Sequence, residues 1–116
     1  MKGILAGFLT IILTQASWYS TEACKFNSDP ACPTASGKSL YALEAEGALF
    51  AASYQFPLGS MVRVTNQGNG KQVVVRIEDR GPNKRLKGRL LDLGKHAFKQ
   101  IADERMGLAT VSTELI

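Results

Sequence analysis

Carboxylate side chains are the groups in this sequence best suited to chemistry, and Asp79 is the leading candidate. It opens the segment Asp79-Arg80-Gly81-Pro82, where an apolar alternating stretch ends at a Gly-Pro turn. A carboxyl group held at the end of a strand can give or take a proton as a general acid or base. The alternative is that Asp79 is a turn residue, which accepts backbone N–H bonds or pairs with Arg80.

Asp92 is the second carboxylate placed for a role of its own. It lies between Leu91 and Leu93, so in an extended segment its side chain points away from both leucines. It could then line a groove, or it could cap a helix that begins after Gly94. We expect the single histidine, His96, on the solvent side of that helix.

Metal chemistry is not expected. One histidine cannot supply a multi-histidine metal site, and two cysteines cannot supply a Cys₄ zinc site. The sequence carries no other motif that calls for a cofactor, so none is expected.

The two cysteines, Cys24 and Cys32, are eight positions apart in a stretch rich in turn-forming residues. If the chain is exported, they are expected to form one local disulfide. The rival interpretation is a reactive thiol, but no histidine stands near either cysteine in the sequence. The pair is therefore interpreted as structural.

The N-terminus resembles an export signal. Residues 1–3 give a short basic start, residues 4–13 form an apolar run, and residues 14–16 end in small side chains. A run of about ten residues is too short to span a membrane, and no cysteine follows it at once to carry a lipid. The prediction is a signal peptide over residues 1–16, cleaved near Ala16, and a periplasmic or extracellular protein without a lipid anchor. A buried N-terminal helix is the alternative.

Length and charge limit the classes of protein further. Residues 17–116 suffice for one small domain, which excludes large barrels and two-domain enzymes. The net charge of +4 favours an anionic partner, but no nucleic-acid-binding motif accompanies it, so nucleic acid is not expected.

The elements that must position these residues are mostly short strands. Residues 61–66 and 71–78 alternate apolar and polar side chains around a turn at residues 67–70, which predicts a hairpin with Val62 and Val64 facing inward. Short helices are predicted at residues 39–46 and 93–104. Further strands are predicted at residues 16–20, 50–53, 89–93 and 108–116. About six short strands with few helices favour a small closed barrel.

Several motifs together resemble the RlpA-like family. They are Ala16-Ser-Trp-Tyr-Ser20, Thr34-Ala-Ser-Gly37, Phe56-Pro-Leu-Gly59, Val62-Arg-Val-Thr-Asn66, Val73-Val-Val-Arg76, Asp79-Arg-Gly-Pro82 and Leu91-Asp-Leu93. The resemblance implies a mainly β fold, a six-stranded double-psi β-barrel with one or two short helices. It also implies a lytic transglycosylase that acts on peptidoglycan glycan strands stripped of their peptides. A non-catalytic barrel that binds such glycan is the alternative.

Of the three site positions of the family, this sequence has the family's residue at one. Asp79 matches the family's Asp and is the expected acid/base. Lys38 stands where active members have Glu, and Ser53 stands where they have His. Lys38 could bind an anion instead, and Ser53 either contacts the ligand or packs in the barrel wall.

A basic rim is expected beside the catalytic position. Lys84, Arg85, Lys87 and Arg89 follow Asp79-Arg80 closely, and a peptide-free glycan exposes a carboxylate on every second sugar. Arg80 is expected to contribute to this rim. The alternative is that the basic run is an ordinary solvated loop with no ligand. Trp18 and Tyr19 could add a stacking surface for sugar rings, but one of the two must face the core. Protein partners are not indicated by the sequence.

Overall fold

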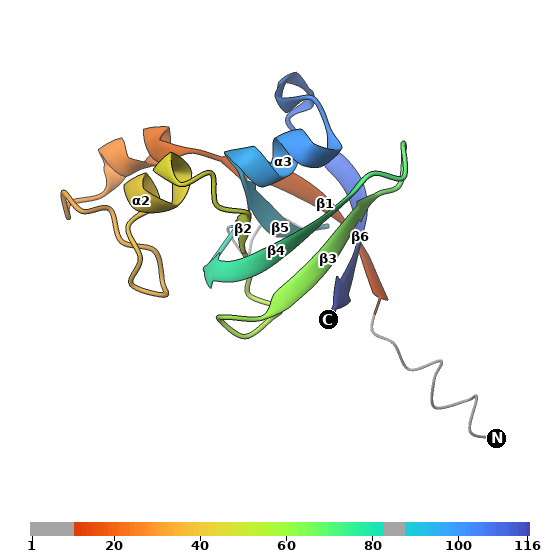
Figure 1. The fold of residues 1–116 in the computed structure, drawn as a ribbon, viewed down its shortest axis with the longest axis horizontal. Helices are drawn as coiled ribbons and strands as arrows, with labels where there is room; N and C mark the ends of the chain where they lie inside the picture. Colours follow the sequence, from red (N-terminus) through yellow and green to blue (C-terminus); the bar gives the residue numbers. More distant parts are fainter. Residues whose placement is uncertain (1–10, 83–87) are drawn as a thin grey trace.

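The computed structural model describes residues 11–82 and 88–116, and the predicted barrel is confirmed (Figure 1). The basic rim residues Lys84, Arg85 and Lys87 lie outside the described residues. The strands are β1 (Ile11–Tyr19), β2 (Phe50–Ala52), β3 (Met61–Asn66), β4 (Gln72–Asp79), β5 (Arg89–Gly94) and β6 (Ala109–Leu115). The helices are η1 (Thr21–Phe26), α2 (Leu40–Ala45), α3 (Lys95–Ile101) and η2 (Glu104–Met106).

The strands close in the order β1-β5-β2-β4-β3-β6, which is not their order along the chain. Two neighbouring pairs, β1/β5 and β2/β4, run parallel, and the other four are antiparallel. The predicted β3–β4 hairpin is present, and Val62 and Val64 are fully buried inside the barrel. The main core holds these valines with other branched and aromatic side chains, among them Val75, Ile77, Leu91, Leu93, Phe98, Ile101 and Val111.

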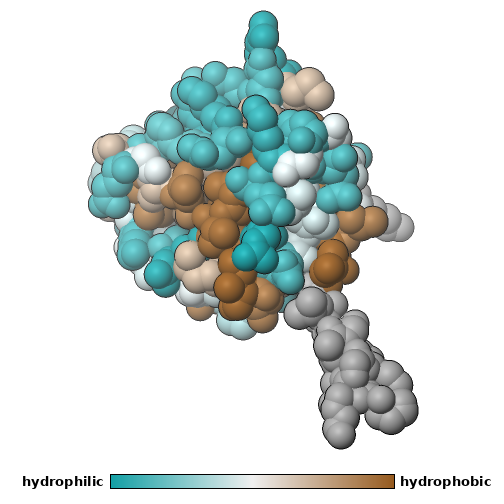
Figure 2. Space-filling view, turned by 45° about the vertical axis from the view of Figure 1, so that its right-hand side comes forward, coloured by the Kyte–Doolittle hydropathy of each residue, from teal (hydrophilic) through white to brown (hydrophobic). Residues whose placement is uncertain are grey.

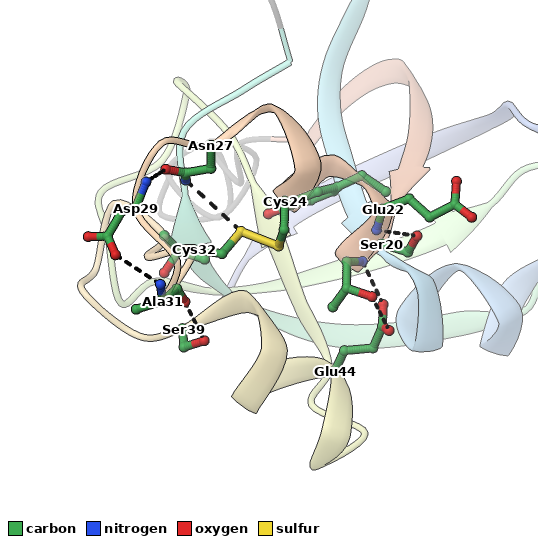
Figure 3. Close-up of a disulfide and its surroundings, with 12 residues drawn as sticks. Ser20, Glu22, Cys24, Asn27, Asp29, Ala31, Cys32, Ser39 and Glu44 are labelled. Atoms are coloured by element: carbon green, nitrogen blue, oxygen red, sulfur yellow. Dashed lines mark hydrogen bonds between the residues drawn. A yellow bond between two sulfur atoms is a disulfide. The ribbon is translucent and has the colours of Figure 1, made fainter.

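A second, smaller core covers part of the outer surface of the barrel wall. It joins the disulfide to α2 and β2 through Cys24, Cys32, Leu40, Leu43 and Phe50. The disulfide predicted from the sequence closes here, with the Cys24 Sγ bonded to the Cys32 Sγ (Figure 3). We call residues 20–48 the disulfide lobe; it lies to one side of the barrel (Figure 1).

Local hydrogen bonds hold the disulfide lobe in shape. The Glu44 carboxylate accepts bonds from both the backbone N–H and the hydroxyl of Thr21, which ties α2 to η1 (Figure 3). Asp29 accepts from the Ala31 N–H, and the Ser39 hydroxyl donates to the Ala31 carbonyl (Figure 3). These bonds fix the backbone that leads into the Thr34-Ala-Ser-Gly37 motif.

Gly94 is where the small core packs most closely on the barrel. A Cβ added at this residue would lie 2.5 Å from Cε1 of Phe50. We therefore expect Gly94→Ala to lower the free energy of unfolding by about 1–3 kcal/mol, because an aromatic ring edge in a packed core has little room to move. Denaturant unfolding measures this loss.

The matched test of that close contact is a double variant. Phe50→Leu removes the ring that the new methyl group would strike. The double variant Gly94→Ala/Phe50→Leu should then lose less stability than the sum of the two single changes. Strictly additive losses would show that Gly94 is needed for another reason.

Three sequence expectations about local structure need correction. The helix predicted over residues 93–104 is shorter, because Leu93 and Gly94 belong to β5 and α3 ends at Ile101. Gly94 is the N-cap of α3, and no side chain caps this helix, so Asp92 is not a helix cap. His96 is half-buried rather than solvent-facing: its Nε2 lies 3.0 Å from the Glu44 carbonyl oxygen.

The first strand begins earlier than expected. β1 starts at Ile11, and residues 11–16 pair with β6 in an antiparallel register. A signal peptide ending at Ala16 would remove all of those paired residues from the barrel. The leader boundary stays a prediction, which N-terminal sequencing of the exported protein would test.

The surface combines polar and apolar regions. Figure 2 shows apolar side chains gathered in a band across one face, with hydrophilic side chains around it. Large apolar residues that are exposed include Ile11, Leu13, Leu115 and Ile116 at the adjoining ends of β1 and β6. Within residues 11–82 and 88–116, no helix is long and apolar enough to cross a membrane.

Candidate functional site

Four side chains form a row across the outer surface of the barrel wall. Asp79 on β4 and Asp92 on β5 are both in register with Ala52 on β2, which lies between them. Ser17 on β1 is in register with Asp92 on its other side. Registered residues on neighbouring strands point to the same face of a sheet. We call this row the carboxylate face.

The spacing of the strands sets the distance between the two carboxylates. Neighbouring strands lie about 4.8 Å apart, so the α-carbons of Asp79 and Asp92 are separated by about 10 Å. Ala52 between them is only 2% exposed, so other parts of the chain cover its side chain. Gly81 lies against Ala52, since a Cβ added at Gly81 would be in ordinary contact with the Ala52 Cβ, at 3.6 Å.

Asp79 reaches this face because of a β-bulge. Ala51 is paired with Ile77 and Ala52 with Asp79, so Glu78 is an extra residue in β4. Without the bulge, simple alternation from the buried Ile77 would turn Asp79 toward the barrel interior. The bulge instead brings Asp79 onto the same face as Asp92.

The Asp79 carboxylate is held as a hydrogen-bond acceptor. It accepts hydrogen bonds from the Tyr19 hydroxyl at 3.0 Å, from the Ala35 N–H at 2.9 Å and from the N–H of the next residue, Arg80, at 2.9 Å. All of these donors come from the chain itself, and two of them are backbone amides. The orientation of this carboxylate is therefore fixed before any ligand binds.

Asp92 has a different environment. Its carboxylate accepts one bond from the Ser17 hydroxyl at 2.9 Å. Burial raises the pKa of Asp92 to about 6; the Ser17 bond and the charge of Arg89 act in the opposite direction, and the Asp79 charge adds to the rise. A carboxyl group whose pKa is raised in this way is suited to give up a proton near neutral pH.

Tyr19, rather than Trp18, faces the carboxylates. The Tyr19 ring packs edge-on against Phe50, and burial followed by the nearby Asp79 raises the pKa of its hydroxyl. Trp18 points to the other side of β1, where it packs against Phe98 and donates from Nε1 to the Glu104 carbonyl. The stacking role predicted for Trp18 does not fit this placement, because strand alternation turns its ring toward the main core.

Lys38 forms an ion pair that joins the disulfide lobe to β4. Its Nζ lies 3.1 Å from Oε2 of Glu78, the extra residue of the β4 bulge. The Glu78 side chain is only 6% exposed, whereas that of Lys38 is 60% exposed, and Arg76 lies 4.0 Å from the same carboxylate oxygen. Lys38 therefore balances a buried charge and holds the segment that donates the Ala35 N–H to Asp79.

The side chains of Ser53 and Arg80 form hydrogen bonds to the backbone of the loop after β2. Ser53 is fully buried, and its Oγ accepts the Gln55 N–H. The Arg80 Nη1 donates to the carbonyls of Ser53 and Phe56 at 2.7 and 2.6 Å. The burial of Ser53 does not fit a ligand-binding role, whereas Arg80 is half-buried with its Nη1 on the backbone, and its ligand-binding role stays a prediction.

Arg89 is a site residue that sequence reasoning did not single out, because it appeared only as one member of a basic run. In the structure its positive charge acts on Asp92 and partly offsets the rise in the pKa of that residue. Among the described residues, no group of three or more His, Cys, Asp or Glu side chains could hold a metal ion.

The comparison with solved structures identifies the class of fold. The apo expansin of Clavibacter michiganensis superposes with a TM-score of 0.67 at 19% identity, covering 92% of this chain and 50% of that one. A Streptomyces papain inhibitor gives 0.66 at 18% identity, covering 92% and 94%. At such low identity these likenesses establish the fold alone: a small six-stranded double-psi β-barrel.

Sequence comparison then gives the family. The model for "Lytic transglycolase" matches residues 13–113. A protein named endolytic peptidoglycan transglycosylase RlpA from Pseudomonas aeruginosa is 41% identical over 101 residues, 85% of this chain and 26% of that one. Its namesake from Pasteurella multocida is 42% identical over 122 residues, 100% of this chain and 38% of that one. The chain belongs to the RlpA-like family, and it spans between a quarter and two fifths of the length of these relatives.

Proposed function

We propose that this protein is exported and cleaves peptidoglycan glycan strands that lack stem peptides, as an endolytic lytic transglycosylase. The observation that carries the proposal is the carboxylate face, where Asp79, held by three hydrogen-bond donors, and Asp92, whose pKa is raised by burial, flank Ala52. The names of the relatives, which describe peptidoglycan transglycosylases, support the same substrate.

The two carboxylates have separate roles in this proposal. Asp92, whose pKa is raised to about 6, gives its proton to the oxygen of the glycosidic bond as the bond from that oxygen to C1 breaks. The 6-hydroxyl of the same sugar attacks C1 and passes its proton to the Asp79 carboxylate. The product is a 1,6-anhydro sugar end, and no water is consumed. Solvent then returns the proton to Asp92 and removes one from Asp79.

Geometry supports this division of labour. Paired carboxyl groups on either side of a glycosidic bond work at separations of roughly 5–10 Å. The α-carbon separation of about 10 Å across two strand spacings is compatible with that range, since both side chains rise from the same face. Asp79 is already oriented by three donors, so little reorganisation is needed in the transition state.

Product analysis tests the proposal directly. The protein and its Asp79→Asn variant are incubated with glycan strands freed of peptides by an amidase, and the products are identified by mass spectrometry. Anhydro-ended fragments from the wild type, at least about 100-fold fewer from the variant, are the expected result. Fragments with a reducing end formed by water would instead indicate a hydrolase.

A non-catalytic glycan-binding barrel is the second candidate. It is favoured by the Lys38–Glu78 ion pair and the burial of Ser53, because neither position offers the Glu or His that active relatives of the family are expected to use. Strands that bind to the wild type but remain uncut would support this candidate.

A further inference from the structure

Arg89 stands out because of a donor that the protein does not use. Within the described residues, its Nε is the one buried side-chain nitrogen or oxygen that lacks a hydrogen-bond partner. Buried polar groups in folded proteins are almost always paired, so an exception calls for an explanation. A ligand that accepts hydrogen bonds is one such explanation.

A second β-bulge directs Arg89 to the carboxylate face. Gln15 is paired with Arg89 and Ala16 with Leu91, which leaves Leu90 as the extra residue in β5. Simple alternation would place Arg89 and Asp92 on opposite faces, because they are three positions apart. The extra residue turns Arg89 to the outer surface, in register with Gln15 and on the side of Ser17 and Asp92.

The bulge is held by hydrogen bonds rather than left loose. The Thr14 hydroxyl accepts the Leu90 N–H at 2.9 Å and donates to the Gly88 carbonyl at 3.0 Å. The Gln15 N–H donates to the same Gly88 carbonyl at 2.9 Å. The backbone at the start of β5 is therefore fixed, and this holds the Arg89 side chain in a defined position.

We propose that Arg89 binds the lactyl carboxylate that a peptide-free glycan strand exposes beside the bond to be cut. This inference rests on the proposed function and names the residue that recognises the acidic sugar. Guanidinium groups bind carboxylates through two parallel N–H donors, and the Arg89 Nε can supply one of them.

The test compares two ligands that differ only in this carboxylate. Binding is measured by co-sedimentation in the cold, before products accumulate, with peptide-free strands and with the same strands after chemical reduction of their lactyl carboxyl groups. The wild type should bind the native strands about tenfold more tightly. Arg89→Gln should bind both materials equally, at the weaker affinity.

Two further variants separate recognition from general charge. Arg89→Lys keeps the charge but loses the planar pair of donors, so it should keep only part of the preference. Lys71→Gln removes an exposed cation beyond the other end of β4 and should keep the full preference. Thermal unfolding of each variant confirms that it is folded.

Different outcomes would contradict the role of Arg89 and the proposed function on which it rests. Equal binding of both materials by the wild type, or a full preference in Arg89→Gln, would overturn the role of Arg89. A wild type that binds neither material would overturn the proposed function itself.

Discussion

Asp92→Asn should cut glycan strands about 100- to 10,000-fold more slowly than the wild type while still binding them. The amide cannot give up a proton to the leaving oxygen, whereas general acid catalysis typically contributes a factor of this size. The Ser17 hydroxyl can still donate to the amide oxygen, so the position of the side chain should be preserved. The release of anhydro ends measures the rate, and co-sedimentation measures binding.

The pH dependence of cleavage should identify Asp92 as the acid. Its pKa of about 6 means that the protonated form is lost as pH rises above 6, so the rate should fall about tenfold per pH unit on the alkaline side. This alkaline limb should be absent from the residual activity of Asp92→Asn. A wild-type rate that stays constant from pH 5 to about pH 8 would contradict an acid role for Asp92.

The same substitution should stabilise the fold, with a defined pH dependence. The folded-state pKa of about 6 lies above the ordinary value of 3.8, so the folded protein binds the proton more tightly than the unfolded chain. The stabilisation from that proton is complete below pH 3.8 and is lost as pH rises through 6. Asn carries no charge at any pH, so the variant should gain at most about 3 kcal/mol over the wild type above pH 6 and nothing below pH 4.

A matched control separates this effect from general charge removal. Glu46 is exposed at the end of α2, and Glu46→Gln removes the same charge outside the carboxylate face. Activity and stability of this variant should stay close to wild type across the same pH range. A gain in stability equal to that of Asp92→Asn would point to net charge instead of burial.

Replacing both cysteines with serine should lower the free energy of unfolding by about 2–3 kcal/mol. The disulfide joins Cys24 and Cys32, eight positions apart, and cross-linking a loop of that length removes about this much free energy from the unfolded chain. The change should also weaken the hydrogen bond from the Ala35 N–H to the Asp79 carboxylate, because Ala35 follows closely after Cys32. Denaturant unfolding measures the first effect, and hydrogen exchange at Ala35 measures the second.

Reductant provides the control for the disulfide. A reducing agent should bring the wild type to the stability of the double serine variant and leave that variant unchanged. A wild type that is equally stable with and without reductant would contradict a stabilising role for the bond. Changing both cysteines together avoids leaving a free thiol that could pair with another molecule.

The local pattern of the sequence determined the elements and the interior of the barrel. Alternation of apolar residues predicted the β3–β4 hairpin and the inward direction of Val62 and Val64, because side chains of a strand alternate between its two faces. The export-like N-terminus and the turn-rich spacing of Cys24 and Cys32 predicted their pairing, because disulfides persist in oxidising compartments. The motifs of the chain also predicted the family, which the comparisons confirm.

Only the tertiary structure decided which side chains meet on the carboxylate face. Asp79 and Arg89 reach it through bulges in β4 and β5, and one extra residue reverses every side chain beyond it. Sequence alternation cannot locate such a residue, because a bulge depends on how the neighbouring strand pairs. The pairing of β4 and β5 with β2 joins segments far apart in the chain. The raised pKa of Asp92 follows from that same burial, so it too was decided by the fold.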